Sequence, residues 1–221
     1  MSIRLSEQTA PGTPPAGKVY LYAKSDGLLY AKDDAGNEVA VAVALATQAE
    51  VDAGTASKVV TSGLNKVSLG TPVATTSGTS VTIASSLPAG IRRITVTFSG
   101  VSSNGVSPFL IQLGDSGGIE PSGYVSAAFN LAAQVDSTAG FVVMTASTAA
   151  LAFHGSITLT LANASTNTWV VEGNINSSGS GNAWGCSGSK SLSAVLDRLA
   201  LTTVGGSDTF DAGEVNVSYE R

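Results

Sequence analysis

The chain has 221 residues, of which only 12% are charged, and its net charge is −5. The one adjacent basic pair is Arg92-Arg93, and without clustered Lys and Arg to bind phosphates a nucleic-acid partner is not expected. One His and one Cys leave little material for acid–base chemistry and exclude an internal disulfide or a cysteine-ligated zinc site. We therefore expect a structural or binding protein rather than an enzyme, with no catalytic residues, no metal site and no cofactor.

No stretch of the sequence is expected to enter a membrane. The longest apolar runs, such as residues 39–46, fall far short of the roughly 20 residues that a membrane-spanning helix needs. The first seven residues turn polar at once, so we expect no secretory signal peptide. A hydrophobic fraction of 43% is ordinary for a folded chain and argues against disorder.

Charged residues are distributed unevenly along the chain. Residues 1–69 carry 13 of them, and the much longer remainder carries 14. This shift coincides with Gly70-Thr71-Pro72 and predicts a boundary near residue 70. The expected parts, in chain order, are an extended arm over 1–17, a β-meander over 18–43, a short helical connector over 44–69 and a β-sandwich over 70–221.

The first part of the chain predicts an arm followed by a small sheet. Residues 9–17 contain three prolines and two glycines, which disfavour helix and sheet alike. Asp26-Gly27 and residues 33–37 have the composition of turns, so strands are expected on either side of them. A meander of about 26 residues is too small to bury a core. It must therefore dock on the rest of the chain, on a partner or on copies of itself. The expected strands lie at 18–24, 28–32 and 38–43.

The segment after the meander has the pattern of short helices. Thr47 and Glu50 are spaced as a capping box, in which the two side chains satisfy each other's free backbone amides. Val60, Leu64 and Val67 follow at the spacing of one helix face. Helices this short are not stable in isolation. We therefore expect a connector whose helices pack around an oligomer axis.

From about residue 71 onward the hydrophobic pattern has the period of two that is typical of β-strands. Ile94, Val96 and Phe98, for example, alternate with polar residues, and turns rich in Gly, Ser and Asn separate such segments. We expect eight to ten strands in an antiparallel sandwich of jelly-roll type, with no long helix. Each sheet should have one buried face and one wet face, the latter covered by Ser and Thr more than by Lys and Glu. The expected strands lie at 80–83, 93–98, 109–113, 124–127, 141–145, 157–161, 169–171, 183–187, 199–203 and 215–219.

Four segments together resemble the fibre proteins of tailed bacteriophages. Residues 13–36, TPPAGKVYLYAKSDGLLYAKDDAG, resemble a module common near the N-terminus of those fibres. Residues 46–55 resemble a second fibre motif that usually lies upstream of the tip, and residues 110–115 and 196–220 are similar to parts of a fibre head domain. The resemblance implies a homotrimer, anchored to other virion proteins by its N-terminal arm, with its β-domain turned outward. Such a protein is made in the host cytoplasm and resides at the tail, the tail fibre or the capsid surface.

Three residues of the β-domain are candidates for binding a host polysaccharide. Trp184 and Asn182 lie next to a segment rich in Ser and Gly, and Tyr124 follows a turn with two glycines and a proline. An exposed aromatic ring stacks on the apolar face of a pyranose, while amides bind the hydroxyls. The alternative is that Trp184 and Tyr124 are ordinary core residues of their strands.

Other conspicuous residues are expected to be structural. His154 and Cys186 have no local partner that would activate them, so we expect a structural histidine and a buried or half-buried thiol. Asp115 and Glu120 lie in a Gly-rich loop that matches no calcium-binding pattern, which favours a turn. Trp169 lies in an alternating strand and is expected in the core.

Two classes of function remain open from the sequence. The first is a receptor-binding fibre, in which several weak contacts with host glycan act together. The second is an architectural virion protein, such as a capsid head fibre, a collar component or a baseplate component, whose β-domain binds other virion proteins. A polysaccharide-degrading spike is disfavoured, because glycosidases need two facing carboxylates and the β-domain has few acids outside turn-like sequence.

Overall fold

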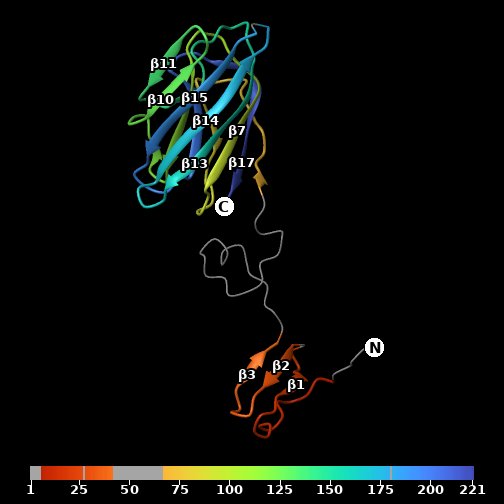
Figure 1. Cartoon of the computed structure of the whole chain (residues 1–221). Coiled ribbons are helices and arrows are strands. Elements are labelled where there is room, and N and C mark those ends of the chain that lie inside the picture. The colour runs from red at the N-terminus through yellow and green to blue at the C-terminus, as the bar shows by residue number, and fades with distance from the viewer. Residues whose placement is uncertain (1–5, 27, 42–66, 180) are drawn as a thin grey trace. The chain divides into compact units, whose positions relative to one another are not determined.

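The computed structural model describes residues 6–26, 28–41, 67–179 and 181–221 (Figure 1). Every regular element in these ranges is a β-strand. The chain divides into two compact units, Met1–Leu64 and Asn65–Arg221. The connector helices expected over 44–69 fall almost entirely outside the described residues. At the end of that range, Ser68–Leu69 forms a strand of the second unit.

The first unit contains the expected three-stranded antiparallel meander, with strand order β1-β2-β3. Leu21 pairs with Ala31, and Ala31 pairs in turn with Val39. The N-terminal arm runs beside β1, where Glu7 bridges Ala23 in parallel and the Gln8 amide donates to the Ala23 carbonyl at 2.9 Å. The three strands are β1 Tyr20–Ala23, β2 Leu29–Lys32 and β3 Glu38–Ala40.

The second unit is built from two antiparallel sheets. The larger has nine strands, with the order β11-β10-β15-β14-β13-β7-β17-β4 and with β5 also paired to β17. The smaller has five, with the order β12-β8-β16-β6 and with β9 paired to β8. The strands are β4 Ser68–Leu69, β5 Val73–Ala74, β6 Ser80–Ala84, β7 Arg93–Ser103, β8 Phe109–Asp115, β9 Gly118–Ile119, β10 Val125–Phe129, β11 Gln134–Ser137, β12 Phe141–Val142, β13 Phe153–Asn163, β14 Thr168–Ser177, β15 Ala183–Ser191, β16 Arg198–Thr203 and β17 Phe210–Glu220.

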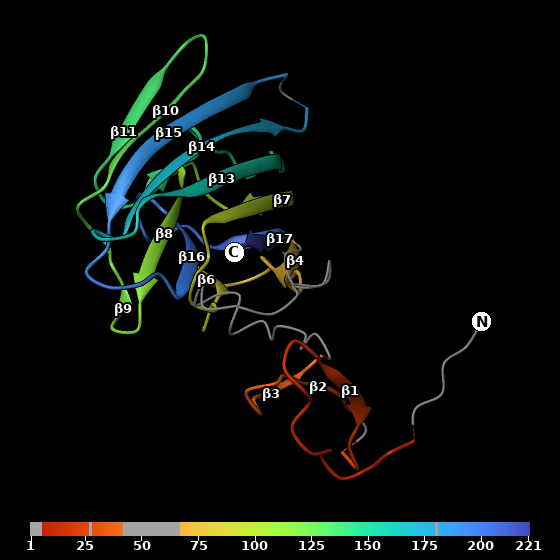
Figure 2. The same ribbon diagram turned by 60° about the horizontal axis from the view of Figure 1, so that its bottom comes forward.

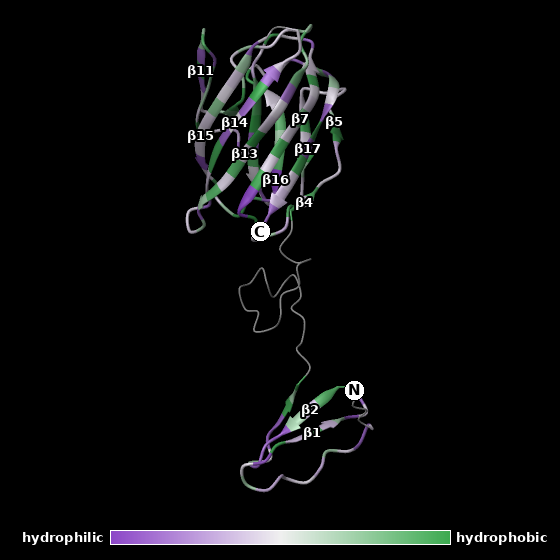
Figure 3. Ribbon diagram, turned by 45° about the vertical axis from the view of Figure 1, so that its right-hand side comes forward, coloured by the Kyte–Doolittle hydropathy of each residue, from purple (hydrophilic) through white to green (hydrophobic). Residues whose placement is uncertain are grey.

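The two sheets of the second unit share one hydrophobic core. Figure 2 shows the nine-stranded sheet as an arc, with β8, β16 and β6 on its inner side. Residues from both sheets belong to a single buried cluster. Ile94, Val96 and Phe98 are all buried, as their alternation predicted, and Figure 3 shows apolar bands alternating with polar ones along the strands. Burial of one face of each sheet against the other is therefore the main source of stability of this unit.

The five-stranded sheet departs from the expectation of one wet face. Nearly every residue of β8 and β16 is buried, on both faces of the strand. On the side away from the larger sheet, Gln112 Nε2 donates to the Ala139 carbonyl at 2.8 Å, and Thr202 Oγ1 donates to the Thr79 carbonyl at 2.9 Å. Loop backbone covers this side, so these strands are buried without following a simple alternation.

The nine-stranded sheet bends along a line that crosses β13, β7 and β17. The pairing of β7 shifts register next to Gly155 on one side and on both sides of Ala212 on the other. Gly100 and Gly213 have φ angles of 67° and 84°, and a Cβ on Gly213 would lie 2.3 Å from the carbonyl carbon of Gly100. Bulges of this kind bend a strand and increase its twist. Gly213 thus lets two neighbouring backbones approach where the sheet curls, and both glycines hold the left-handed conformation there.

We expect Gly213→Ala to destabilise the second unit by about 2–3 kcal/mol, because the new Cβ meets backbone and the residue must hold a left-handed conformation. Gly206→Ala is the matched control, since Gly206 has a φ of 66° with open space around its Cβ position. It should lose only about 1 kcal/mol. Urea unfolding followed by tryptophan fluorescence measures both losses, and equal losses would contradict the close contact.

Candidate functional site

The three-stranded sheet of the first unit has one face made only of apolar side chains. Leu21, Ala31 and Val39 form one row across the strands, and their neighbours at alternate positions continue it. Leu21 is 57% exposed and Val39 is 65% exposed. We call this surface the apolar face. Its residues are Val19, Leu21, Ala23, Leu29, Ala31, Val39 and Val41.

The opposite face of the same sheet is polar and aromatic, and the arm contacts it. Tyr22 is buried and its ring stacks on that of Tyr30, with centroids 6.1 Å apart. Glu38 forms ion pairs with Lys24 and Lys32. The pKa of Glu38 is lowered, chiefly by the hydrogen bond from Lys24. The first unit therefore satisfies its charges on one side while its apolar face is left exposed.

Acidic residues between the strands build the turns of this sheet. Asp26 accepts a hydrogen bond from the Leu28 amide at 3.0 Å and another from the Tyr30 hydroxyl at 2.7 Å. Asp33 accepts from the amides of Ala35 and Asn37 at 3.0 and 2.8 Å. Asp26 and Asp33 are therefore turn residues, as expected, because their side chains accept hydrogen bonds from backbone amides of the turns.

The nine-stranded sheet turns its other face away from the core, and we call this surface the outer face. Its residues alternate with the buried ones along each strand. Small polar side chains dominate it, and Val125, Phe129 and Val170 are its exposed large apolar ones on β10 and β14. On β10, β15, β14 and β13 its residues include Val125, Ala127, Phe129, Gly185, Ser187, Ser189, Val170, Glu172, Asn174, Ser156, Thr158 and Thr160.

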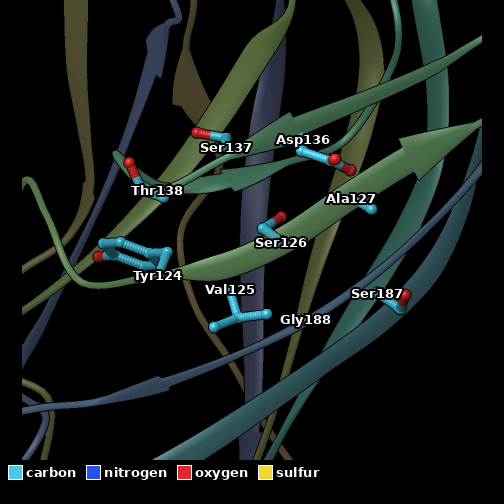
Figure 4. A pocket seen from close by; sticks show the side chains of 9 residues that line it. All are labelled: Tyr124, Val125, Ser126, Ala127, Asp136, Ser137, Thr138, Ser187 and Gly188. Atoms are coloured by element: carbon cyan, nitrogen blue, oxygen red, sulfur yellow. The ribbon is translucent and has the colours of Figure 1, made fainter.

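Two hollows lie side by side on this part of the sheet. The first, of about 540 Å³, extends over β10, β11 and β15 and is lined by Asp136 and Ser187 among others (Figure 4). The second, of about 580 Å³, extends over β10, β15, β14 and β13 and contains Phe129 and Glu172. Ser187 lines both. Volumes of this size are typical of ligand sites, and no Lys or Arg occurs among the described residues that line either hollow.

Trp184 is buried, which corrects the expectation of an exposed indole. Only 3% of it is accessible, its Nε1 donates to Thr145 Oγ1 at 2.8 Å, and its ring packs against Phe153 at 5.7 Å between centroids. A ring in this position cannot stack on a sugar at the surface. The structure thus shows the alternative, a core tryptophan whose one polar atom has a partner.

Tyr124 lines the first hollow, but only 1% of it is accessible, so its ring is not available for stacking either. Its ring meets that of Phe141 edge to face at 5.0 Å, and its hydroxyl accepts from the Leu113 amide at 2.7 Å. Burial raises the pKa of this hydroxyl strongly. Asn182 is exposed in the turn before β15 and is not one of the residues that line the two hollows. The three candidates therefore do not form one site.

The acidic loop after β8 belongs to a hydrogen-bonded network. Asp115 accepts from the Gly117 amide at 2.7 Å and from the Ser193 hydroxyl at 2.5 Å, which lower its pKa. Glu120 pairs with the buried Lys190 at 2.5 Å and accepts from the Ser193 amide at 2.8 Å. Desolvation opposes ionisation of Glu120, but the hydrogen bond from Lys190 and those from Ser193 outweigh it, so its pKa is lowered. These carboxylates hold the turn, as expected.

The remaining candidates are structural residues. His154 Nδ1 accepts the Gly100 amide at 3.2 Å, at the bend of β7. Cys186 is buried, and desolvation raises the pKa of its thiol to about 12. Trp169 is buried as predicted. Among the described residues, His, Cys, Asp and Glu nowhere gather in a group of three or more that could hold a metal ion.

In the part of the chain that the structure describes, there is no helix long and apolar enough to cross a membrane. Comparison of the sequence with protein-family models and with curated proteins yields no match. The function must therefore be argued from the two surfaces, the apolar face and the outer face.

We expect Glu120→Gln to destabilise the second unit by about 2 kcal/mol at pH 7, because the buried Lys190 loses its counter-charge. The pKa of Glu120 in the folded chain is below its unfolded value of about 4.3. Its stabilising effect is therefore complete above that value and is lost as the pH falls through the folded pKa.

Urea unfolding at pH 7 and at successively lower pH values, followed by tryptophan fluorescence, measures this difference. Both tryptophans, Trp169 and Trp184, lie in the second unit, so the signal reports on that unit alone. Glu214→Gln, at an exposed position, is the control and should change little. A Glu120→Gln loss that is as large at low pH as at neutral pH would contradict the argument.

Proposed function

We propose that this chain is a virion fibre protein of a tailed bacteriophage, of the tail-fibre or receptor-binding type. It assembles as a homotrimer through its N-terminal unit, which also anchors it to other virion proteins. Its C-terminal β-domain is presented to glycan on the host surface. The observation that carries this proposal is the apolar face of the three-stranded sheet.

A small sheet with such a face needs a partner. A three-stranded sheet gains independent stability by burying a hydrophobic face, and here that face is exposed. Side chains such as Leu21 and Val39, each more than half exposed, together present on the order of several hundred Å², the size at which an apolar patch marks an interaction surface. The face carries no charge, so copies of it do not repel one another. A closed symmetric assembly buries the same patch on every copy.

The strand order of the second unit supports a jelly-roll-like sandwich. The chain changes sheet at each step from β6 to β7, β8, β10, β12 and β13, and again from β15 to β16 and β17. This alternation between two packed sheets is the connectivity of jelly rolls, which recur in viral capsid proteins and in lectins. Here β13 and β14 form a hairpin that widens one sheet.

The outer face suits a protein that adheres without breaking bonds. Hydroxyl and amide side chains dominate it, and they can exchange hydrogen bonds with water for hydrogen bonds with sugar hydroxyls. Each such contact is weak, but several β-domains on one particle act together through their effective concentration. The proposed function therefore requires no catalytic residue and no cofactor.

The alternative is an architectural virion protein, and one observation favours it. Leu131 is fully exposed in the turn between β10 and β11, where the Asn130 side chain accepts the amides of Ala132 and Ala133. An apolar side chain held out on an ordered turn is a suitable contact for another virion protein. Cryo-EM of whole virions separates the two functions. Three-fold density at a tail fibre with the β-domain outermost supports the fibre, whereas β-domains packed on a capsid or collar favour the architectural protein.

We expect the full chain to be a trimer and the double variant Leu21→Asp, Val39→Asp to be a monomer. Two carboxylates on each copy cannot be buried without partners, so the apolar faces no longer associate. Size-exclusion chromatography with light scattering at high micromolar concentration measures the mass.

Val125→Asp is the matched control, because Val125 is 72% exposed on the outer face. It should leave the trimer intact. Circular dichroism verifies that the variants are folded. A wild-type monomer, or a trimer that survives the double substitution, would refute assembly through the apolar face.

A further inference from the structure

We propose that the second hollow is a binding site for a neutral pyranose unit of a polysaccharide, with Phe129 as the stacking surface. This inference rests on the proposed function, because it names the ligand class of the β-domain. It moves the candidate site from Trp184 and Tyr124 in the core to the outer face.

Phe129 provides the aromatic surface that the buried residues cannot. It is 50% exposed at the end of β10 and pairs across the strands with Gly185. An ideal Cβ on Gly185 would lie 2.8 Å from the tip of the Phe129 ring, so the ring extends over the glycine. Because Gly185 has no side chain, the Phe129 ring can lie over the sheet at this position. The exposed side of the ring is then available to stack on the C–H groups of a sugar.

The polar groups of the hollow lie in two rows across the strands, and the first row starts from this ring. In the first row, Phe129, Gly185, Asn174 and Ser156 occupy successive strands. In the second row, Ser187, Glu172 and Thr158 do the same. Strands are about 4.8 Å apart. Because the ring extends over Gly185 on β15, Asn174 and Glu172 on the next strand, β14, lie about one strand spacing beyond it, within reach of the hydroxyls of a sugar stacked on the ring. Carboxylate and amide oxygens accept from sugar hydroxyls, and the amide nitrogen donates to them.

The charges favour a neutral sugar over an acidic one. Glu172 lines the second hollow and Asp136 lines the first, and the described lining residues supply no Lys or Arg to balance an anion. A uronic acid or a phosphorylated sugar would place like charges near each other. The two hollows meet at Ser187, so a polysaccharide can continue from the second into the first.

The test is saturation-transfer difference NMR with the full chain and four neutral probes, the methyl glycosides of glucose, galactose, mannose and N-acetylglucosamine. Glucuronic acid is the acidic probe. At least one neutral glycoside should receive saturation at the C–H protons of one ring face. We expect Phe129→Ala to weaken that binding by about tenfold, because the stacking surface is lost.

Two variants keep the result interpretable if Phe129→Ala folds poorly. Phe129→Tyr retains a ring and should bind within about twofold of the wild type. Leu131→Ala removes an exposed apolar side chain that does not line the hollow and should also bind normally. Tryptophan fluorescence verifies folding of the second unit in each case.

Several results would overturn the inference: no saturation of any neutral glycoside, stronger binding of glucuronic acid, equal binding by wild type and Phe129→Ala, or equal weakening by Phe129→Tyr. Capture of a virion protein by this face in place of a sugar would also overturn it. The mass measurement on Leu21→Asp, Val39→Asp is independent of these outcomes. If the chain is a trimer that binds none of the sugars, only this inference is refuted. If it is a monomer that binds a sugar, the proposed trimer is refuted instead.

Discussion

The second unit depends on one constraint, which is that a broad sheet must curl to cover a narrower one. A flat nine-stranded sheet would leave part of its apolar face in water, so β7, β13 and β17 bend together. The bend brings the backbone of Gly213 closer to that of Gly100 than a side chain on Gly213 would permit. It also frees the Gly100 amide from the ladder, and His154 accepts it. His154, the only histidine of the chain, therefore has a structural role at the bend of the sheet.

The two units differ in how the apolar side of their sheets is covered. In the second unit each sheet finds its cover within the same chain, and loop backbone even covers the far side of β8 and β16. In the first unit the arm contacts the polar side, where Lys32 donates to the Pro11 carbonyl at 2.9 Å, and the apolar side is left open. This difference fits the proposed assembly, in which the first unit associates with other copies and the second unit is available to bind a ligand.

Much of the fold follows from periodicity, and the failures have physical causes. Strands with one wet face, such as β7 with Ile94 and Val96, show the alternation that predicts them. The sequence does not predict β11, because this edge strand has a single apolar residue, Val135, and therefore no apolar alternation. The Ser- and Gly-rich neighbours of Trp184 favour a surface position, yet in β15 Trp184 alternates with Gly185, which is the outward residue. The sequence does not indicate Phe129 as a surface residue, because the expected strand ends at residue 127 whereas β10 continues to Phe129.

The position of the arm beside β1 has a consequence for how copies can meet. A sheet with two free edges can add strands from other chains at both, which leads to fibrils of unlimited length. Here Glu7 and Gln8 already occupy hydrogen-bonding positions next to Ala23 on β1. Addition of a strand from another chain next to Ala23 is therefore blocked in every copy. The arm thus limits edge-to-edge growth through this sheet, as an assembly of fixed size needs.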